Sequence, residues 1–220
     1  MNYLAHAYLS FDQPEILAGN LISDFVKGKK KLDYPPGIQK GITLHRSIDW
    51  FTDTHEATRQ AKSFFRPVYG LYSGPITDVI YDHFLATDPE IFPPSAPTNT
   101  APAAAGFLPF VFDATGEPPS SLAAFSQRTY SQLAGFISFF PDRFSRMFSY
   151  MRSQDWLTNY WHRQGIFNSL TGLSRRASHM PDPATACSLF IQHYEELQAC
   201  YRAFFPAVRS YAAETLQKIE

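Results

Sequence analysis

The residue types that bind hydrolytic metal ions occur close together between Leu44 and His55. This stretch contains two histidines and two aspartates within twelve residues. Residues four apart share one face of a helix, so His45 would face the same way as Asp49, and Asp49 the same way as Asp53. Imidazole and carboxylate groups on one helix face suit a divalent cation that activates water.

A second group of the same kind follows at residues 78–84. Asp78 and Asp82 again lie four apart, and His83 comes directly after Asp82. Helix caps and ion pairs, such as Asp49 with Arg46, are the better explanation for any single residue of this type. Two such groups among large apolar residues favour a metal site instead, because a buried carboxylate is costly unless it is paired or coordinated. The sequence therefore predicts an enzyme.

Two further polar residues lie in apolar segments nearer the N-terminus. Asp24 follows Asn20 by four residues on a predicted helix face that is otherwise apolar. A carboxylate contributes nothing to the packing of such a face, so we expect Asp24 to belong to the functional site. His6 lies in an apolar helix start, where a lone histidine is more often a core residue than a ligand. His55 lies beyond a predicted helix break, and we expect it to be exposed.

Other kinds of site are absent from the sequence. It has no glycine-rich phosphate loop, no Gly-x-Ser-x-Gly elbow, no cysteine pair at zinc spacing and no Glu-x-x-His signature of di-iron bundles. The remaining interpretation is a site of carboxylates and imidazoles on helices, which suits Mn²⁺ or Mg²⁺.

The elements that must position these residues are helices nearly throughout. Apolar residues follow a helical period along most of the chain, with Pro35-Pro36 opening the helix of the first cluster and Gly74-Pro75 that of the second. Residues 88–120 are rich in proline and follow no helical period, so we expect a loop insertion or lid there. The predicted fold is an all-α helical bundle of one domain spanning residues 1–220.

Composition agrees with one well-buried soluble domain. The chain has 220 residues, 45% of them hydrophobic and 16% aromatic, with no uninterrupted apolar run near the ~18 to 20 residues of a membrane span. No secretory signal is recognisable, and the two cysteines are not placed to pair, so we expect a cytoplasmic protein without a membrane partner.

Charge is balanced overall but unevenly distributed. The net charge of −1 argues against a nucleic-acid partner. Residues 121–180 carry seven arginines against only Asp142 and Asp155. Solvated helix faces explain such arginines in most proteins. The alternative is a positive surface that meets an acidic partner.

Several long, ordered motifs resemble the acyl carrier protein phosphodiesterase family. The resemblance spans nearly the whole chain except roughly residues 88–120. It rests on Met1–His6, Ala18-Gly19-Asn20 with Ser23–Gly28, Ile42–His55, Asp82–Leu85, Gln154–Tyr160, Gly165-Ile166, Ser174–Arg176 and Phe204–Pro206.

The resemblance implies an all-helical, HD-domain-like fold related to the HD-type metal phosphohydrolases. It also implies an activity and a partner: hydrolysis, with Mn²⁺, of the phosphodiester that joins 4′-phosphopantetheine to a serine of holo-acyl carrier protein. The products would be apo-acyl carrier protein and 4′-phosphopantetheine. The chain departs from the ordinary HD pattern, because it has no His-Asp dipeptide and only the reversed Asp82-His83.

Residues and resemblance together predict the site. We expect the metal to be held by some of Asp24, His45, Asp49, Asp82 and His83, with His6, Asn20, His55 and Asp78 around them. Arg46 and Lys27 would stabilise charge on the phosphoryl group, and Asp53 or His55 would orient the water or protonate the leaving oxygen. Carrier proteins of this type are acidic, so Arg143, Arg146, Arg175 and Arg176 are predicted to bind the substrate protein.

Two other functions stay open on the sequence alone. One is an HD-type phosphohydrolase that acts on a nucleotide or another small phosphodiester. The other is a non-catalytic helical binding protein, whose purified form would contain no stoichiometric metal.

Overall fold

In the computed structural model of the chain, residues 1–94, 117–177 and 179–219 are described. These residues form helices and no strand, which confirms the predicted all-α class. The α-helices are α1 (Tyr3–Tyr8), α2 (Pro14–Ile22), α3 (Pro36–Thr54), α4 (Glu56–Tyr69), α5 (Ser73–Ala86), α6 (Ser120–Ala134), α7 (Asp142–Ser153), α8 (Trp156–Asn159), α9 (Arg163–Arg176), α10 (Pro183–Gln192) and α11 (Tyr194–Lys218). Short 3₁₀ turns are η1 (Ser23–Phe25), η2 (Gly28–Asp33), η3 (Gly70–Tyr72) and η4 (Ile137–Phe139).

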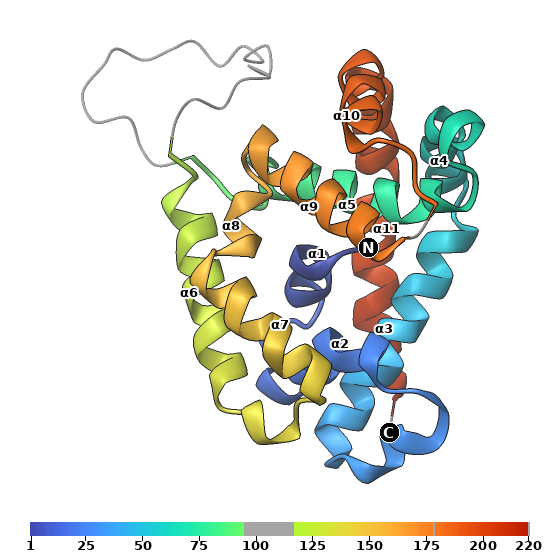
Figure 1. Cartoon of the computed structure of the whole chain (residues 1–220). Coiled ribbons are helices and arrows are strands. Elements are labelled where there is room, and N and C mark those ends of the chain that lie inside the picture. Colours follow the sequence, from blue (N-terminus) through green and yellow to red (C-terminus); the bar gives the residue numbers. More distant parts are fainter. Residues whose placement is uncertain (95–116, 178, 220) are drawn as a thin grey trace.

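The short helix α1 lies in the middle of the molecule. Figure 1 shows it between α6 and α7 on one side and α3 and α11 on the other. It has six residues, too few for a stable isolated helix, and Leu4, Ala5, His6 and Ala7 are buried by its neighbours. Its position is therefore determined by tertiary contacts.

The carboxylate of Asp82 supplies the N-terminal cap of α1 from another helix. It accepts hydrogen bonds from the backbone N–H groups of Asn2 (3.2 Å), Leu4 (2.7 Å) and Ala5 (3.3 Å). The side chain of Asp82 is fully buried in α5. The first N–H groups of a helix have no hydrogen-bond partner within the helix, and the helix dipole also attracts a negatively charged carboxylate at this end. Asp82 thus anchors α1 to α5.

Two glycines allow α2 and α3 to approach with their backbones nearly touching. A Cβ atom on Gly19 would lie 2.1 Å from the carbonyl oxygen of Ile38, and one on Gly41 would lie 2.3 Å from that of Ile16. No side chain fits at either position. The close approach brings Asn20, next to Gly19, up to the face of α3 that carries His45.

The long helix α11 packs against α3, α4 and α5 and closes one side of the core. An aromatic group forms where it meets α5: the rings of Tyr81 and Phe204 stack at 5.1 Å, and those of Phe84 and Tyr201 lie 5.8 Å apart. One hydrophobic core runs through the described helices. None of them is long and apolar enough to cross a membrane.

Two residues near the start of the predicted insertion, residues 88–120, make contacts with the rest of the protein. Asp88 accepts a hydrogen bond from the hydroxyl of Tyr201 (3.0 Å), and Phe92 is buried against Tyr8 and Phe125. Phe92 belongs to the hydrophobic core because its ring covers apolar surface there, whereas Asp88 is half-buried. Residues 95–116 of the predicted segment lie outside the described residues, and its last residue, Ser120, already begins α6.

Candidate metal centre

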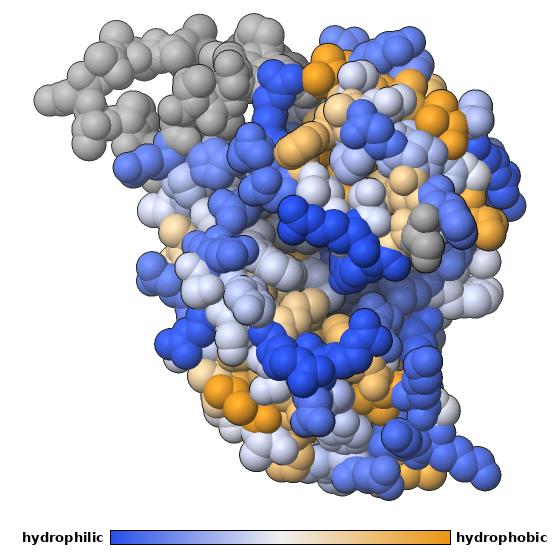
Figure 2. Space-filling view, viewed as in Figure 1, coloured by the Kyte–Doolittle hydropathy of each residue, from blue (hydrophilic) through white to orange (hydrophobic). Residues whose placement is uncertain are grey.

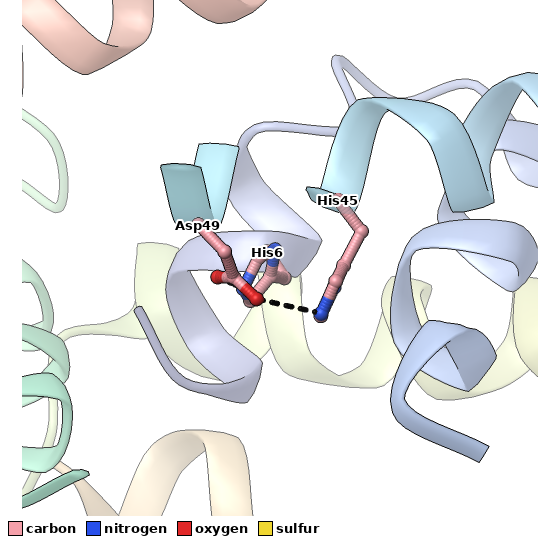
Figure 3. Close-up of side chains that lie close together, drawn as sticks. All are labelled: His6, His45 and Asp49. Carbon is pink, nitrogen blue, oxygen red and sulfur yellow. Dashed lines mark ion pairs between the residues drawn. The ribbon is translucent and has the colours of Figure 1, made fainter. Parts of the chain in front are cut away.

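Three helices bring one cluster of polar side chains together. His6 comes from α1, Asn20 from α2, and His45 and Asp49 from α3, where they lie one turn apart as predicted. Figure 3 shows the imidazole rings of His6 and His45 side by side, with the carboxylate of Asp49 against them. The rings stack with centroids 4.0 Å apart and an angle of 19° between their planes.

The Nε2 atoms of both histidines face carboxylate oxygens. His6 Nε2 lies 3.2 Å from one oxygen of Asp49, and His45 Nε2 lies 3.1 Å from the other. His45 Nε2 is also 3.1 Å from Oδ1 of Asp24, which belongs to η1. Asp24, His45 and Asp49, all expected as metal ligands, are thus brought together. His6, expected only to surround them, offers a ligand atom of its own.

The side chain of Asn20 determines which nitrogen each ring presents. Its amide nitrogen donates to the carbonyl oxygen of His6 (2.9 Å) and to the hydroxyl of Ser10 (3.0 Å), which fixes the orientation of the amide. Its oxygen therefore accepts from Nδ1 of His6 (2.8 Å) and of His45 (3.2 Å). Both Nδ1 atoms then carry protons, and both Nε2 atoms are turned toward the carboxylates.

This donor set fits a divalent cation. Nε2 of His6 is buried and makes no hydrogen bond of acceptable geometry among the described residues, although a carboxylate oxygen lies nearby. A neutral imidazole lone pair facing a carboxylate is repulsive unless a cation lies between them. Ligand atoms on neighbouring corners of an octahedron with bonds of about 2.1 Å are about 3.0 Å apart, close to the separations seen here. The described residues contain one such group that could hold a metal: His6, His45 and Asp49.

Protonation of the cluster follows from the same contacts. Burial alone would lower the pKa of His45, but the carboxylates of Asp24 and Asp49 outweigh it and raise the pKa to about 9. Burial and the neighbouring His45 lower the pKa of His6. The hydrogen bond from His45 lowers the pKa of Asp24. Burial opposes ionisation of Asp49, yet both histidines together lower its pKa. A proton on His45 thus occupies the place where a metal ion would supply positive charge.

The cluster is closed on its histidine side and open on its carboxylate side. The side chains of His6 and His45 are 4% and 7% exposed, whereas those of Asp49 and Asp24 are 41% and 70% exposed. A metal held here would have protein on one side and room for water and substrate on the other, as a catalytic site requires. Two hollows elsewhere, one between α9 and α10 and one beside α11, share no residue with the cluster.

Other residues of the predicted ligand set and its surroundings have different partners. Asp82 caps α1, and Nδ1 of His83 donates to the carbonyl oxygen of Tyr160 at 2.8 Å, so the structure brings neither into the cluster. Burial lowers the pKa of His83 to about 4, which keeps it neutral. Asp78 lies 2.9 Å from the backbone nitrogen of Met1.

Asp53 and His55, expected to handle water or the leaving oxygen, also point elsewhere. Asp53 forms an exposed ion pair with Lys62 at 2.7 Å. His55 caps α4 by accepting the N–H of Ala57. Asp53 lies one turn beyond Asp49, as its i,i+4 spacing predicts. That turn is the last of α3, and there Asp53 pairs with Lys62 instead of joining the cluster.

Arg46 and Lys27 lie near η1, the turn that carries Asp24. Nη2 of Arg46 donates to the carbonyl oxygen of Val26 (2.9 Å), which places this guanidinium near η1. Lys27 is exposed directly after that carbonyl. Val26 and Lys27 follow Asp24 by two and three residues, so the guanidinium of Arg46 and residue Lys27 both lie near the segment that carries Asp24.

Exposed arginines lie on both flanks of α1. Arg143 and Arg146 are on α7, and Arg175 and Arg176 are at the end of α9. In Figure 1, α1 lies between these two elements. From the same side, strongly hydrophilic side chains cover α7 and the end of α9, with paler and apolar atoms between them (Figure 2).

Two site residues were missed or undervalued in the sequence. His6 was taken for a core residue because its neighbours are apolar. Asn20 is also a polar residue in an apolar helix. Its presence was the available signal that His6 has a buried polar partner. Tyr3, one turn before His6 on α1, was not singled out at all; its hydroxyl donates to the sulfur of Met147 of α7 at 3.3 Å.

Comparison with known proteins gives consistent matches. The family model described as "Acyl carrier protein phosphodiesterase" matches residues 1–103 and 114–208, which leaves unmatched a shorter internal stretch than predicted. An "Acyl carrier protein phosphodiesterase" of Yersinia pestis is 30% identical over 208 residues, covering 94% of this chain and 95% of that one. One from Salmonella paratyphi A is 30% identical over 213 residues, covering 97% and 98%. No solved structure matches, so the likeness to the HD-type fold stays a prediction.

Proposed function

The chain belongs to the acyl carrier protein phosphodiesterase family and is an enzyme, and from this premise we propose its reaction. It hydrolyses the phosphodiester between 4′-phosphopantetheine and a serine of holo-acyl carrier protein, with a divalent metal. The products are apo-acyl carrier protein and 4′-phosphopantetheine. The observation that carries this proposal is the convergence of His6, His45 and Asp49 with both Nε2 atoms facing carboxylate oxygens.

His6, His45, Asp49 and Asp24 would hold the metal. Two imidazoles with two carboxylates form a mixed nitrogen and oxygen set, which suits Mn²⁺ and accepts Mg²⁺ less well. When bound, the cation supplies positive charge that polarises the phosphoryl group and makes a water acidic enough to react near neutral pH.

The chain's own residues orient the reactants. Asn20 holds both histidines in one tautomer, so that neither ring rotates away. Asp24, ionised and exposed, accepts a hydrogen bond from the attacking water and aligns it with phosphorus. Arg46 and Lys27, near η1, offset the negative charge that develops on the phosphoryl oxygens while the serine oxygen leaves.

The surface formed by Arg143, Arg146, Arg175 and Arg176 is the proposed docking surface for the carrier protein. The helices that carry these arginines, α7 and α9, lie on either side of α1 (Figure 1), and all four residues are exposed. An acidic helical substrate would meet complementary charge there, which orients it with its modified serine toward the open carboxylates.

A test of the function compares metal-site and surface variants on holo-acyl carrier protein. The wild type with Mn²⁺ should convert holo- to apo-carrier protein, followed by intact-protein mass. His6→Ala, His45→Ala and Asp49→Asn should each lose at least ~100-fold in rate, the scale on which disturbed metal sites fail. Asp33→Asn, an exposed aspartate away from the cluster, is the control. Turnover of nucleotides in place of holo-carrier protein would refute the proposed substrate, and a metal-free protein with full activity would refute the proposed metal.

A further inference from the structure

Tyr3 carries a hydroxyl group that the reaction described above does not yet use. It lies on α1 one turn before His6, and residues three apart share a helix face. Its ring lies 6.4 Å from that of Trp156 in α8. Its hydroxyl points toward α7, so Tyr3 reaches from the metal cluster toward the flank that carries Arg143 and Arg146.

The hydroxyl of Tyr3 donates its hydrogen bond to a weak acceptor. The guanidinium of Arg176 lies close enough to the Tyr3 hydroxyl to lower its pKa, and because a guanidinium only donates, the Tyr3 oxygen is the acceptor in any bond between them. The hydroxyl proton then points to the sulfur of Met147 at 3.3 Å. A thioether is a weak acceptor. An anionic oxygen placed nearby would accept the hydrogen bond from the Tyr3 hydroxyl instead of the sulfur, and this charge-assisted bond would be stronger.

Arg176 is itself oriented by the end of α9. Its Nε donates to the carbonyl oxygen of Gly172 at 3.1 Å, which anchors one edge of the guanidinium. The terminal amines stay available for Tyr3 and for a ligand. Arg176 is exposed, so the ligand could come from solvent.

The charge of Asp24 raises the pKa of the Tyr3 hydroxyl, so the phenol lies within electrostatic range of this carboxylate. Burial raises the pKa of Tyr3 to about 12, partly offset by Arg176, so the phenol stays protonated and able to donate at neutral pH. The hydroxyl therefore combines a donor proton with a nearby positive charge, on a residue one helical turn before the candidate ligand His6.

We propose that Tyr3 and Arg176, the Tyr3–Arg176 pair, form a binding subsite for a non-bridging oxygen of the phosphodiester. The hydroxyl of Tyr3 and the terminal amines of Arg176 donate to one oxygen while the reacting phosphorus lies over Asp24 and Asp49. This inference rests on the proposed function, and it assigns a substrate contact to Tyr3 and a specific role to one of the four arginines of the docking surface.

Inorganic phosphate is a probe that needs no turnover. Calorimetry of the Mn²⁺-loaded protein should give an affinity for phosphate that falls roughly 10-fold in Tyr3→Phe and more in Arg176→Gln, the loss expected for one hydrogen bond to a charged group. The affinity for Mn²⁺ itself should not change in either variant. The matched controls are Tyr150→Phe, an exposed tyrosine of α7, and Arg59→Gln, an exposed arginine of α4.

A double variant tests whether the two residues act as one unit. Because Arg176 orients the Tyr3 hydroxyl, the combined loss of phosphate affinity in the double variant should be smaller than the product of the two single losses. Arg176→Lys keeps the charge but not the fork, and should recover only part of the affinity. A pair with a merely structural role would change the melting temperature and leave the phosphate affinity of the folded protein intact.

The outcomes separate this inference from the proposed function. Wild-type phosphate affinity in both Tyr3→Phe and Arg176→Gln would overturn the subsite, as would an absence of phosphate binding to the wild type. A protein that binds phosphate through the pair but leaves holo-carrier protein intact would overturn the proposed reaction and retain the subsite. With both correct, the two variants should also lose kcat/KM on bis(4-nitrophenyl) phosphate, a small diester that needs no docking surface.

Discussion

At the scale of single residues, the amide of Asn20 links the two histidines, because one oxygen accepts from Nδ1 of both rings. Replacing Asn20 by Leu keeps a similar volume but leaves the tautomers free. We expect the affinity for Mn²⁺ to fall about 10- to 100-fold, the usual cost of removing a residue that orients metal ligands. Calorimetry measures it, and Asn168→Leu, an exposed asparagine of α9, should bind like the wild type. An unchanged affinity in Asn20→Leu would remove this role from Asn20.

The raised pKa of His45 predicts how metal binding depends on pH. Mn²⁺ requires a free Nε2, so a protonated His45 must release its proton when the metal binds. With a pKa of about 9, the affinity should rise close to tenfold per pH unit between pH 6 and 8. Titrations at three pH values in buffers of different ionisation enthalpy would show about one released proton. A flat affinity would mean that His45 is neutral before binding.

Without metal, the same group predicts the opposite trend in stability. The folded pKa of His45 lies above the unfolded value of 6.5. Its protonation therefore stabilises the fold fully below pH 6.5, and this contribution is lost as the pH rises toward about 9. Urea unfolding of the metal-free protein should show the decline, and it should be smaller in His45→Gln.

Part of the site could be predicted from the sequence. Spacing placed His45 and Asp49 on one helix face, and an unexplained carboxylate pointed to Asp24. Spacing could not show which partner each carboxylate has in the folded protein. Asp82 has the same i,i+4 pattern as Asp49, but the backbone N–H groups of α1 already use its carboxylate. That contact joins residues almost eighty positions apart, and no local pattern reveals it.

At the scale of elements, the approach of α2 to α3 decides whether Asn20 reaches His45. Gly41→Ala would place a Cβ against the carbonyl oxygen of Ile16, so the helices must separate. We expect a loss of about 1 to 3 kcal/mol in unfolding free energy, the usual cost of overpacking, together with weaker Mn²⁺ binding.

The matched control for this change is Gly172→Ala in α9. A Cβ there meets nothing within 4 Å, and alanine in a helix is better than glycine by about 0.5 to 1 kcal/mol. Urea unfolding should thus move in opposite directions for the two variants. Equal effects would show that the glycine contact does not hold the helices together.

The segment around residues 95–116 gives a prediction about element connection. The hydroxyl of Ser121 donates to the carbonyl oxygen of Pro93 at 2.9 Å, so the two sides of this segment meet. A short Gly-Ser linker in place of residues 95–116 should therefore leave a cooperatively folded protein with unchanged Mn²⁺ affinity. Circular dichroism and calorimetry measure both. Phe92→Ala, which empties a core position, should cost about 3 to 5 kcal/mol and serves as the contrast. Aggregation of the linker variant would show that the replaced residues contribute to the core.

At the scale of the whole molecule, helical periods predicted the class of fold because each helix buries an apolar face. The helical periods did not predict how the helices are arranged. The central position of α1 depends on contacts with α3, α5 and α7, and the pattern of apolar residues in α1 does not encode these contacts. The unequal distribution of arginines was visible in the sequence, but that its members flank α1 from two separate helices required the structure.

The docking surface predicts a salt dependence. The KM for holo-acyl carrier protein should rise steeply with ionic strength, while kcat changes little, because salt with a Debye length of ~8 Å screens the encounter and not the chemistry. Arg143→Glu with Arg146→Glu should resemble high salt, whereas Arg152→Glu, exposed on the same helix, should not. Cleavage of bis(4-nitrophenyl) phosphate should respond to neither. A flat salt response on the carrier protein would remove the docking role.

The cap that Asp82 provides for α1 has a consequence for when the site can exist during synthesis. The helix that carries His6 is too short to persist alone, and its N–H groups wait for a carboxylate that leaves the ribosome about eighty residues later. A nascent chain stalled before α5 should therefore have no affinity for the metal, even with His45 and Asp49 already outside the exit tunnel. With the proposed function, loading with the metal would be a late event that follows the placement of the central helix.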